Sequence, residues 1–325
     1  MFPSRQGQNP ELDLSVVVPV YNEADAIKNL HREILAVCKK LGTFEILFIN
    51  DGSTDQTLSV IKKLKPLKVV NLRKNFGQTA ALDAGIKLAK GRLIATLDGD
   101  GQNDPKDIPK MIKMLESENL DVVSGWRKNR QDSISKKIAS RAAALVRSKL
   151  IKDGIHDSGC TLKIYRAECF YHVDLFGEMH RFIPALLIIK GFRVGEMVVN
   201  HRPRTTGVTK YNWKRGIKGN LDMMAIWFWK KFSNRPLHLF GGMGLCLVFV
   251  SFCLGAVLIY DRVSKNVDLS NTALTTFTLF TFLVGVQFFV FGLMADILSK
   301  IYYTKTSDKP YLIRDIIENT GQSEW

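Results

Sequence analysis

The 325-residue sequence contains only five cysteines, and no two of them have zinc-finger spacing. Cys246 and Cys253 lie in strongly apolar segments. This usage argues against a disulfide framework and indicates reduced thiols in a cytosolic setting. The first 13 residues, MFPSRQGQNPELD, contain no apolar run, so we expect no cleavable signal peptide.

Acidic side chains are scarce relative to basic ones. The 31 Asp and Glu residues face 46 Lys and Arg residues, which gives a formal net charge of +15 and a pI of about 9.6. Such an excess indicates an anionic partner, namely nucleic acid, an anionic membrane surface or a phosphorylated substrate. A generally basic surface without a specific partner is the alternative.

Charge is absent from two long segments near the C-terminus, residues 239–260 and 272–295. At about 1.5 Å per residue, a helix of either length can cross a hydrocarbon core of about 30 Å. The alternative is a pair of buried helices in a soluble protein. Lys230, Lys231 and Arg235 precede the first segment, and Lys300 and Lys305 follow the second. The positive-inside rule therefore predicts an inner-membrane protein with two spans and both termini in the cytoplasm.

Upstream, short apolar strand patterns alternate with helical patterns. The strands are expected at residues 14–20, 44–50, 67–72, 92–97 and 120–125, and the helices at about 24–40, 55–64, 77–90 and 105–116. Such alternation predicts an α/β fold with a mainly parallel sheet covered on both faces. Ligands bind beyond the carboxyl ends of the strands in such sheets.

Acidic and amide side chains stand at these expected strand ends. Asp51 follows the second strand, and Asp98, Asp100 and Gln102 follow the fourth. Carboxylates this close repel one another unless a positive charge lies among them. Hard oxygen ligands at this spacing suit Mg²⁺ or Mn²⁺, with open positions left for nucleotide phosphates. Asp104, before Pro105, is expected to cap the next helix.

Several motifs occur in a specific order. They are VVVPVYNE at 16–23, INDGSTD at 49–55, NFGQTAALDAG at 75–85, LDGDGQNDP at 97–105, GWRKNRQD at 125–132, DSGCTLKIYR at 157–166, HRFIPAL at 180–186 and HRPRTTGVTKYNW at 201–213. This set resembles glycosyltransferase family 2, which has the GT-A fold. With two C-terminal spans, the chain is similar to the bacterial polyprenyl-phosphate glycosyltransferases, which include the bactoprenol glucosyltransferases. Dolichyl-phosphate mannose synthases are more distant relatives.

The chain departs from the pattern of this group at three positions. Asn50 stands where many relatives have Asp, Gly99 where the group often has Ala, and Thr209 where it usually has Ser. None of these changes removes a needed functional group.

The resemblance implies roles for the motif residues on the donor side. The nucleoside diphosphate would be held by Pro19, Tyr21, Glu23, Asp51 and Asp98. Asp100 and Gln102, together with Asp98, would hold a divalent cation, Mg²⁺ or Mn²⁺. Pro19 could instead only end a strand, Tyr21 could be a packed aromatic, and Glu23 could be an exposed acid at a helix start.

On the acceptor side, the resemblance implies that basic residues grip the lipid phosphate. The matching positions are Arg127, Arg130, Arg202 and Lys210. Asp157 and Asp100 are the two catalytic candidates. Asp157 could act as a base, hold a basic partner in place or cap its own turn. His180 and His201 are expected to be structural.

Two amphipathic segments are expected to lie on anionic membrane lipid. Residues 132–152 place apolar side chains along one face and basic ones elsewhere, and residues 210–231 combine tryptophans with lysines. The first segment could instead be an ordinary surface helix. The expected domains are a GT-A domain at 1–208, interfacial helices at 209–236, a two-helix transmembrane domain at 237–298 and a cytosolic tail at 299–325.

The sequence thus predicts inverting transfer of one sugar to polyprenyl (undecaprenyl) phosphate at the cytoplasmic membrane face. Glucose from UDP-glucose is the expected donor. GDP-mannose or a modified UDP-sugar is the alternative, and a non-catalytic module that binds anionic lipid is the alternative from another class. Acids in the cleft argue against a nucleic-acid partner. The oligomeric state is left open, with a homo-oligomer among the alternatives.

Overall fold

The computed structural model describes residues 11–128, 154–203 apart from 172, 174, 176 and 178, 228, 231–232, 236–265, 268 and 273–305. The chain divides into two compact units, Met1–Ile226 and Trp227–Trp325. The expected interfacial segment 132–152 and most of 209–236 lie outside the described residues, and the finer domain division stays a prediction.

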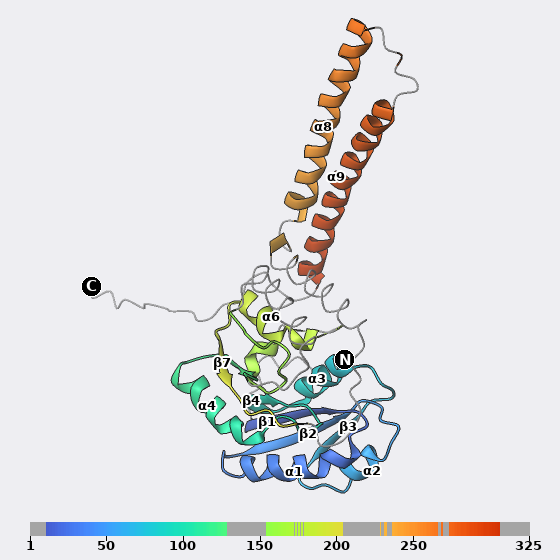
Figure 1. The fold of residues 1–325 in the computed structure, drawn as a ribbon. Coiled ribbons are helices and arrows are strands. Elements are labelled where there is room, and N and C mark those ends of the chain that lie inside the picture. The colour runs from blue at the N-terminus through green and yellow to red at the C-terminus, as the bar shows by residue number, and fades with distance from the viewer. Residues whose placement is uncertain are drawn as a thin grey trace, which may run out of the picture. The chain divides into compact units, whose positions relative to one another are not determined.

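The first unit contains a seven-stranded mixed sheet with helices packed against it (Figure 1). Its strands are β1 (Leu12–Val20), β2 (Phe44–Asn50), β3 (Lys68–Asn71), β4 (Gly91–Thr96), β5 (Val122–Trp126), β6 (Lys163–Arg166) and β7 (Val194–Val198), in the order β3-β2-β1-β4-β6-β5-β7. Its helices are α1 (Ala24–Cys38), α2 (Thr57–Ile61), α3 (Gln78–Leu88), α4 (Ile108–Ser117) and α6 (Ile183–Ile189), with short 3₁₀ turns η1 (Pro105–Asp107), η2 (Ala167–Phe170) and η3 (Met179–Arg181).

The five predicted strands and four predicted helical segments are confirmed, whereas β6 and β7 were not predicted. β6 runs antiparallel between β4 and β5, and the ladders that join β3, β2, β1 and β4 are parallel. The reversal brings residues just before β6 to the edge where β4 ends, because antiparallel neighbours start where their partners finish. The segment that carries Asp157 therefore lies near Asp98.

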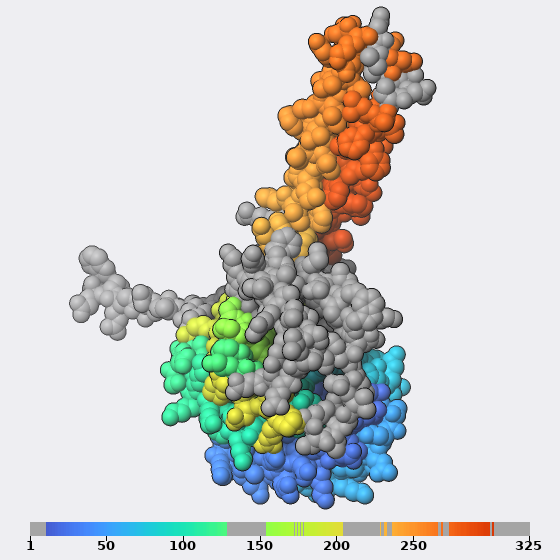
Figure 2. Space-filling view, in the orientation of Figure 1, coloured from blue at the N-terminus to red at the C-terminus, as the bar shows by residue number. Residues whose placement is uncertain are grey.

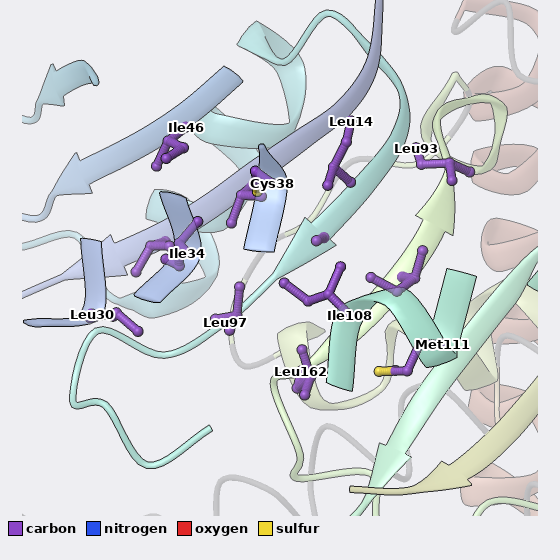
Figure 3. Close-up of a cluster of buried hydrophobic side chains, with 14 of the residues drawn as sticks. Leu14, Leu30, Ile34, Cys38, Ile46, Leu93, Leu97, Ile108, Met111 and Leu162 are labelled. Carbon is purple, nitrogen blue, oxygen red and sulfur yellow. The ribbon is translucent and has the colours of Figure 1, made fainter. Parts of the chain in front are cut away.

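β1 is buried on both faces, as expected for a central strand of an α/β sheet. Val16 and Val18 belong to the cluster that also contains Ile34 of α1 and Met111 of α4, whereas Val17 belongs to the cluster on the opposite face. Figure 3 shows side chains of the first cluster, among them Ile34 and Met111. Two packed faces fix the position of the strand, and so fix the polar residues that follow it.

Pro19 is buried within β1, a position that normally disfavours proline because its nitrogen donates no hydrogen bond. The paired register between β1 and β4 ends at Val17 and Thr96, whereas pairing with β2 continues to Val20. Pro19 thus falls beyond the end of the β4 ladder, where no donor is required. The last residues of β1 are therefore paired with β2 only, at the edge of the sheet where the site lies.

The described part of the second unit contains α8 (Pro236–Lys265) and α9 (Ala273–Lys305), which run side by side (Figures 1 and 2). Both are long and apolar enough to cross a membrane. Most of their large apolar side chains are exposed, which suits a lipid environment and not the core of a soluble protein. Ser251 Oγ donates a hydrogen bond to the carbonyl oxygen of Thr278 across the pair, at 2.9 Å.

Glycines allow α8 and α9 to pack backbone to backbone. A Cβ atom added at Gly244 would lie 2.6 Å from the carbonyl oxygen of Gly285, and one at Gly285 would lie 2.9 Å from the carbonyl oxygen of Gly244. Small residues at helix interfaces are the usual means of close approach within a bilayer.

We expect Gly244→Leu to destabilise the helix pair by about 1–3 kcal/mol, the usual cost of overpacking. The measurement is thermal unfolding of the full chain in detergent. Gly255→Leu on the same helix is the matched control, because nothing lies within 4 Å of a Cβ atom added there. Equal melting temperatures for the two variants would contradict the close packing at Gly244.

Candidate active site

Asp98 lies at the centre of the site, directly beyond β4. Its Oδ1 accepts a hydrogen bond from Nε2 of Gln78 at 2.7 Å, and its Oδ2 accepts one from the hydroxyl of Thr161. Burial, together with the nearby Asp100 carboxylate, raises the pKa of Asp98 above its ordinary value. Two carboxylates held close in a partly dry site indicate a place for a positive charge.

Asp100 and Gln102 occupy the turn after Asp98. Oδ1 of Asp100 accepts a hydrogen bond from the backbone N–H of Gln102 at 3.1 Å, and Gly101 provides the positive φ of 73° that the turn needs. The side-chain amide of Gln102 donates to the carbonyl oxygen of Arg202 at 3.3 Å, which leaves its own oxygen as an acceptor.

The side-chain oxygens of this site fit a divalent cation only in part. Among the residues that the structure describes, no three His, Cys, Asp or Glu side chains are grouped to hold a metal ion. Asp98 and Asp100 supply the repelling carboxylates that a cation would relieve, and Gln102 supplies an amide oxygen. Such a set leaves coordination positions open, as Mg²⁺ sites that share phosphate ligands do.

Asp51 organises the neighbouring loop. Its carboxylate is buried and accepts hydrogen bonds from the backbone N–H groups of Phe76, at 2.7 Å, and Gly77, at 2.9 Å. Gly52 has φ of 65°, and a Cβ atom there would lie 2.4 Å from the backbone carbon of Lys74. The Asp-Gly pair therefore binds the loop that precedes α3 tightly against the end of β2.

The loop between β1 and α1 carries Tyr21 and Glu23, both half-buried. Between them, Asn22 has a positive φ of 55°, and its backbone N–H donates to Ser53 Oγ at 3.0 Å. The backbone N–H of Glu23 donates to the hydroxyl of Thr57 at 2.9 Å. These bonds tie the loops after β1 and β2 together, so the predicted nucleotide-binding residues lie on one edge of the sheet.

Arg127 and Asp157 form a bidentate ion pair. Arg127 Nε lies 2.7 Å from Oδ2 of Asp157, and its Nη2 lies 3.0 Å from Oδ1. Only 9% of the Arg127 side chain and 11% of the Asp157 side chain are exposed. Although burial lowers it, the hydrogen bonds and charge of Asp157 raise the pKa of Arg127, so the guanidinium stays charged.

Arg202 also pairs with carboxylates. Its Nη1 lies 2.7 Å from Oε2 of Glu33, and its Nη2 lies 2.8 Å from Oδ1 of Asp104. Its backbone N–H donates to the carbonyl oxygen of Gln102 at 2.9 Å. Asp104 also accepts from the backbone N–H of Lys106, as its predicted capping role requires. Arg202 therefore joins the segment after β7 to the turn that carries Asp100.

The structure brings most of the predicted residues to one edge of the sheet, and two others fall on residues that it does not describe. Arg130 and Lys210 lie outside the described residues. His180 is buried, and its Nδ1 lies 2.7 Å from Thr79 Oγ1.

Sequence reasoning did not identify several residues that contact the predicted site residues or hold their segments. Gln78, Thr161 and Lys163 stand in motifs quoted above, but nothing in their spacing marked them. Glu33 and Glu196 lie outside those motifs and are recognised only through their contacts.

The seven-stranded mixed sheet is a GT-A-like fold, which matches solved glycosyltransferase structures. A solved structure of glucosyl-3-phosphoglycerate synthase from Mycobacterium tuberculosis, in complex with Mn²⁺ and UDP-glucose, matches the fold with a TM-score of 0.52 at 17% identity, over 68% of this chain and 79% of that one. The same enzyme in complex with Mg²⁺ and UDP matches with a TM-score of 0.52 at 15% identity, over 68% and 79%.

Residues 15–173 match glycosyl transferase family 2. The chain is 39% identical over 321 residues to dodecaprenyl-phosphate galacturonate synthase of Rhizobium johnstonii, covering 96% of this chain and 95% of that protein. It is 33% identical over 325 residues to undecaprenyl-phosphate 4-deoxy-4-formamido-L-arabinose transferase of Salmonella paratyphi A, covering 97% of each. The chain belongs to glycosyltransferase family 2. The resemblance drawn from the motifs is confirmed, and membership of this family supports an enzyme over the non-catalytic alternative.

Proposed function

We propose that this glycosyltransferase moves a single sugar from a nucleotide-sugar to polyprenyl phosphate at the cytoplasmic face of the inner membrane. The observation that carries the proposal is the occurrence, in one chain, of the Asp98–Asp100 site and two helices of membrane-spanning length. The names of both relatives, which specify a dodecaprenyl and an undecaprenyl phosphate, support a lipid phosphate acceptor.

On the donor side, Tyr21, Glu23 and Asp51 would border the nucleoside, as would Pro19. Asp98 and Asp100 would hold Mg²⁺ or Mn²⁺ together with the amide oxygen of Gln102. The cation, when bound, supplies charge stabilisation for the departing nucleoside diphosphate. The solved relatives that contain Mn²⁺ or Mg²⁺ support a divalent cation in general.

On the acceptor side, Arg127 and Arg202 would bind the lipid phosphate, with Arg130 and Lys210 contributing from outside the described residues. Guanidinium groups match phosphate oxygens in a bidentate geometry. The second pKa of a phosphomonoester is about 6, so the nucleophilic oxygen is largely ionised at neutral pH. It forms a bond to the anomeric carbon while the bond to the nucleoside diphosphate breaks, which inverts the configuration without a covalent enzyme intermediate.

The alternatives for the donor differ in the sugar that is transferred. Glucose from UDP-glucose stays a prediction, with GDP-mannose as one alternative. The relatives are named for galacturonate and for a formamido-arabinose, which favours a modified sugar, as in the alternative of a modified UDP-sugar. A polar pocket discriminates strongly between sugars only through hydrogen bonds and charges placed for a particular substituent.

The test is a screen of radiolabelled UDP- and GDP-sugars with undecaprenyl phosphate, on the full chain in detergent. We expect one UDP-sugar to transfer its label to the lipid fraction, and only with Mn²⁺ or Mg²⁺ present. A thermal shift with UDP and Mn²⁺, but none with DNA, is expected alongside. Failure of every donor to label the lipid would contradict the proposal.

We further propose that α8 and α9 both span the membrane and that both termini are cytoplasmic, with anionic lipid attracting the basic segments that flank them. The basic outer flanks carry this proposal. A reporter fused after residue 325 is expected to score as cytoplasmic, and one inserted between α8 and α9 as periplasmic. A periplasmic score for the C-terminal fusion would overturn the topology.

A further inference from the structure

Both oxygens of the Asp157 carboxylate accept hydrogen bonds from Arg127. Oδ2 accepts hydrogen bonds from Arg127 Nε at 2.7 Å and from the Arg127 backbone N–H at 3.2 Å, while Oδ1 accepts from Nη2 at 3.0 Å. A proton taken up by Asp157 would weaken this pairing and leave the buried Arg127 guanidinium without its counter-charge. Breaking a buried ion pair in this way is strongly unfavourable. The geometry therefore disfavours Asp157 as a proton acceptor.

The turn that carries Asp157 is itself held from two sides. Oε1 of Glu196, on β7, accepts the backbone N–H groups of His156, at 3.1 Å, and Asp157, at 2.9 Å. Its Oε2 lies 2.8 Å from His156 Nδ1. The buried Lys163 ammonium, on β6, donates to the carbonyl oxygens of Cys160 and, at 3.4 Å, Ser158.

A carboxylate thus binds the amide groups at the start of the turn, and an ammonium binds the carbonyl groups that follow. Only 10% of the Glu196 side chain is exposed, and Lys163 is 2% exposed. Burying either charge is costly unless it is paired or hydrogen-bonded, so these contacts restrict the turn to one geometry. Neither residue has been given a role in the donor or metal site.

The segment that holds the Arg127 guanidinium also contacts the donor carboxylates. Thr161, four residues after Asp157, donates its hydroxyl to Oδ2 of Asp98, and a Cβ atom added at Gly159 would lie 3.2 Å from Nη2 of Arg127. The charged or ionisable groups that face Arg127 from the packed elements are Asp157, Asp98, Lys163 and the Cys160 thiol. The segment that holds Arg127 is therefore bonded to Asp98 of the donor site.

We infer that Asp157, Glu196 and Lys163 are positioning residues that fix the Arg127 guanidinium for the acceptor phosphate, and that Asp157 is not a general base. The inference rests on the proposed function, because it needs a phosphate acceptor. The acceptor supplies its own ionised oxygen, and no proton passes to the protein. Arg127 is the residue of this set that contacts the substrate.

The two roles predict different pH profiles. A base would matter most below about pH 6, where the phosphomonoester keeps its second proton, and would become dispensable at higher pH. A positioning residue matters equally at low and at high pH, because the Arg127 geometry does not depend on the protonation of the substrate.

The experiment is a double-mutant cycle on the full chain in detergent with Asp157→Asn, Arg127→Ala and the double variant. Steady-state transfer to undecaprenyl phosphate is measured at about pH 5.5 and about pH 8.5, on either side of the phosphate pKa. Thermal shift with UDP and Mn²⁺ verifies that each variant folds and binds donor. Arg127→Lys, which keeps a cation beside Asp157, replaces the alanine variant if that variant does not bind UDP.

We expect Asp157→Asn to lower kcat/KM for the acceptor by roughly 10²-fold, the loss that small misplacements of a reacting group produce. The loss is expected to be equal at both pH values, and the double variant to be no worse than Arg127→Ala alone. Glu196→Ala is expected to raise the acceptor KM while UDP binding is kept. Glu116→Ala, which removes the exposed partner of Arg92, is the matched control and should behave as wild type.

Recovery of Asp157→Asn at the higher pH, or multiplying losses in the double variant, would overturn the inference while the proposed function stands. Wild-type behaviour of Glu196→Ala would overturn the part assigned to Glu196. If the wild-type chain glycosylates no polyprenyl phosphate, the proposed function fails and this inference fails with it. The wild-type assay alone therefore separates the two failures.

Discussion

Replacing Asp100 with alanine is expected to lower the turnover number by about 10²-fold or more, the usual cost of losing a group that stabilises transition-state charge. Asp100 is only partly buried, and one hydrogen bond, from the Gln102 backbone, is made to its carboxylate by the described residues. Its second oxygen is therefore available to a cation, whereas both oxygens of Asp98 already accept side-chain hydrogen bonds. The measurement is steady-state transfer as a function of Mn²⁺ and Mg²⁺ concentration.

The control for Asp100 is Glu118→Ala, which removes an exposed acid at the end of α4 and should leave turnover unchanged. Chelation supplies an independent check. Activity of the wild-type enzyme is expected to disappear in excess EDTA and to return when Mn²⁺ or Mg²⁺ is restored. Full activity in excess EDTA would rule out the metal site proposed at Asp98 and Asp100.

Replacing Arg202 with alanine is expected to lower kcat/KM for the acceptor by roughly 10²-fold in detergent, because one strong donor to the phosphate is lost. UDP-sugar binding should stay near normal. The guanidinium already pairs with Glu33 and Asp104, so it is charged and held in place before the acceptor arrives. A phosphate dianion would then bind the guanidinium either in place of these carboxylates or in addition to them.

Two comparisons separate a phosphate contact from a structural link. Glu33→Gln removes one partner of Arg202, and it should have little effect on transfer if Arg202 grips phosphate; a loss equal to that of Arg202→Ala would identify Arg202 as a link only. Neutralising Lys136 and Lys137, outside the described residues, should have little effect in detergent and should weaken activity modestly in anionic liposomes, more so at low salt. A basic side chain near an anionic leaflet contributes about 1 kcal/mol there and is screened by salt.

Local patterns were sufficient to predict that the acidic residues proposed for the donor side meet at one edge of the sheet. Asp51, Asp98 and Asp100 each follow an apolar strand within a few residues, and parallel strands place such residues at one edge. The prediction of a mainly parallel sheet needed only the alternation of strands and helices. The two long apolar helices needed only length and the absence of charge.

The proposed acceptor side depends on contacts that local patterns do not contain. Arg202 and Glu33 are 169 residues apart in sequence, and Glu196 meets Asp157 from 39 residues away. The antiparallel insertion of β6 between β4 and β5 brings Thr161 and Lys163 to the site, and strand propensity does not specify neighbours in a sheet. Side chains held by long-range pairing were therefore the ones that sequence reasoning missed.

The most direct test of polyprenyl-phosphate glycosylation is mass spectrometry of the lipid product together with analysis of the released nucleotide. The purified chain would be incubated with undecaprenyl phosphate, Mn²⁺ and the UDP-sugar selected by the screen. We expect a lipid that carries one sugar through a single phosphate, with one UDP released for each lipid formed. A lipid with two phosphates and release of UMP, or release of UDP with free sugar and unchanged lipid, would contradict the account.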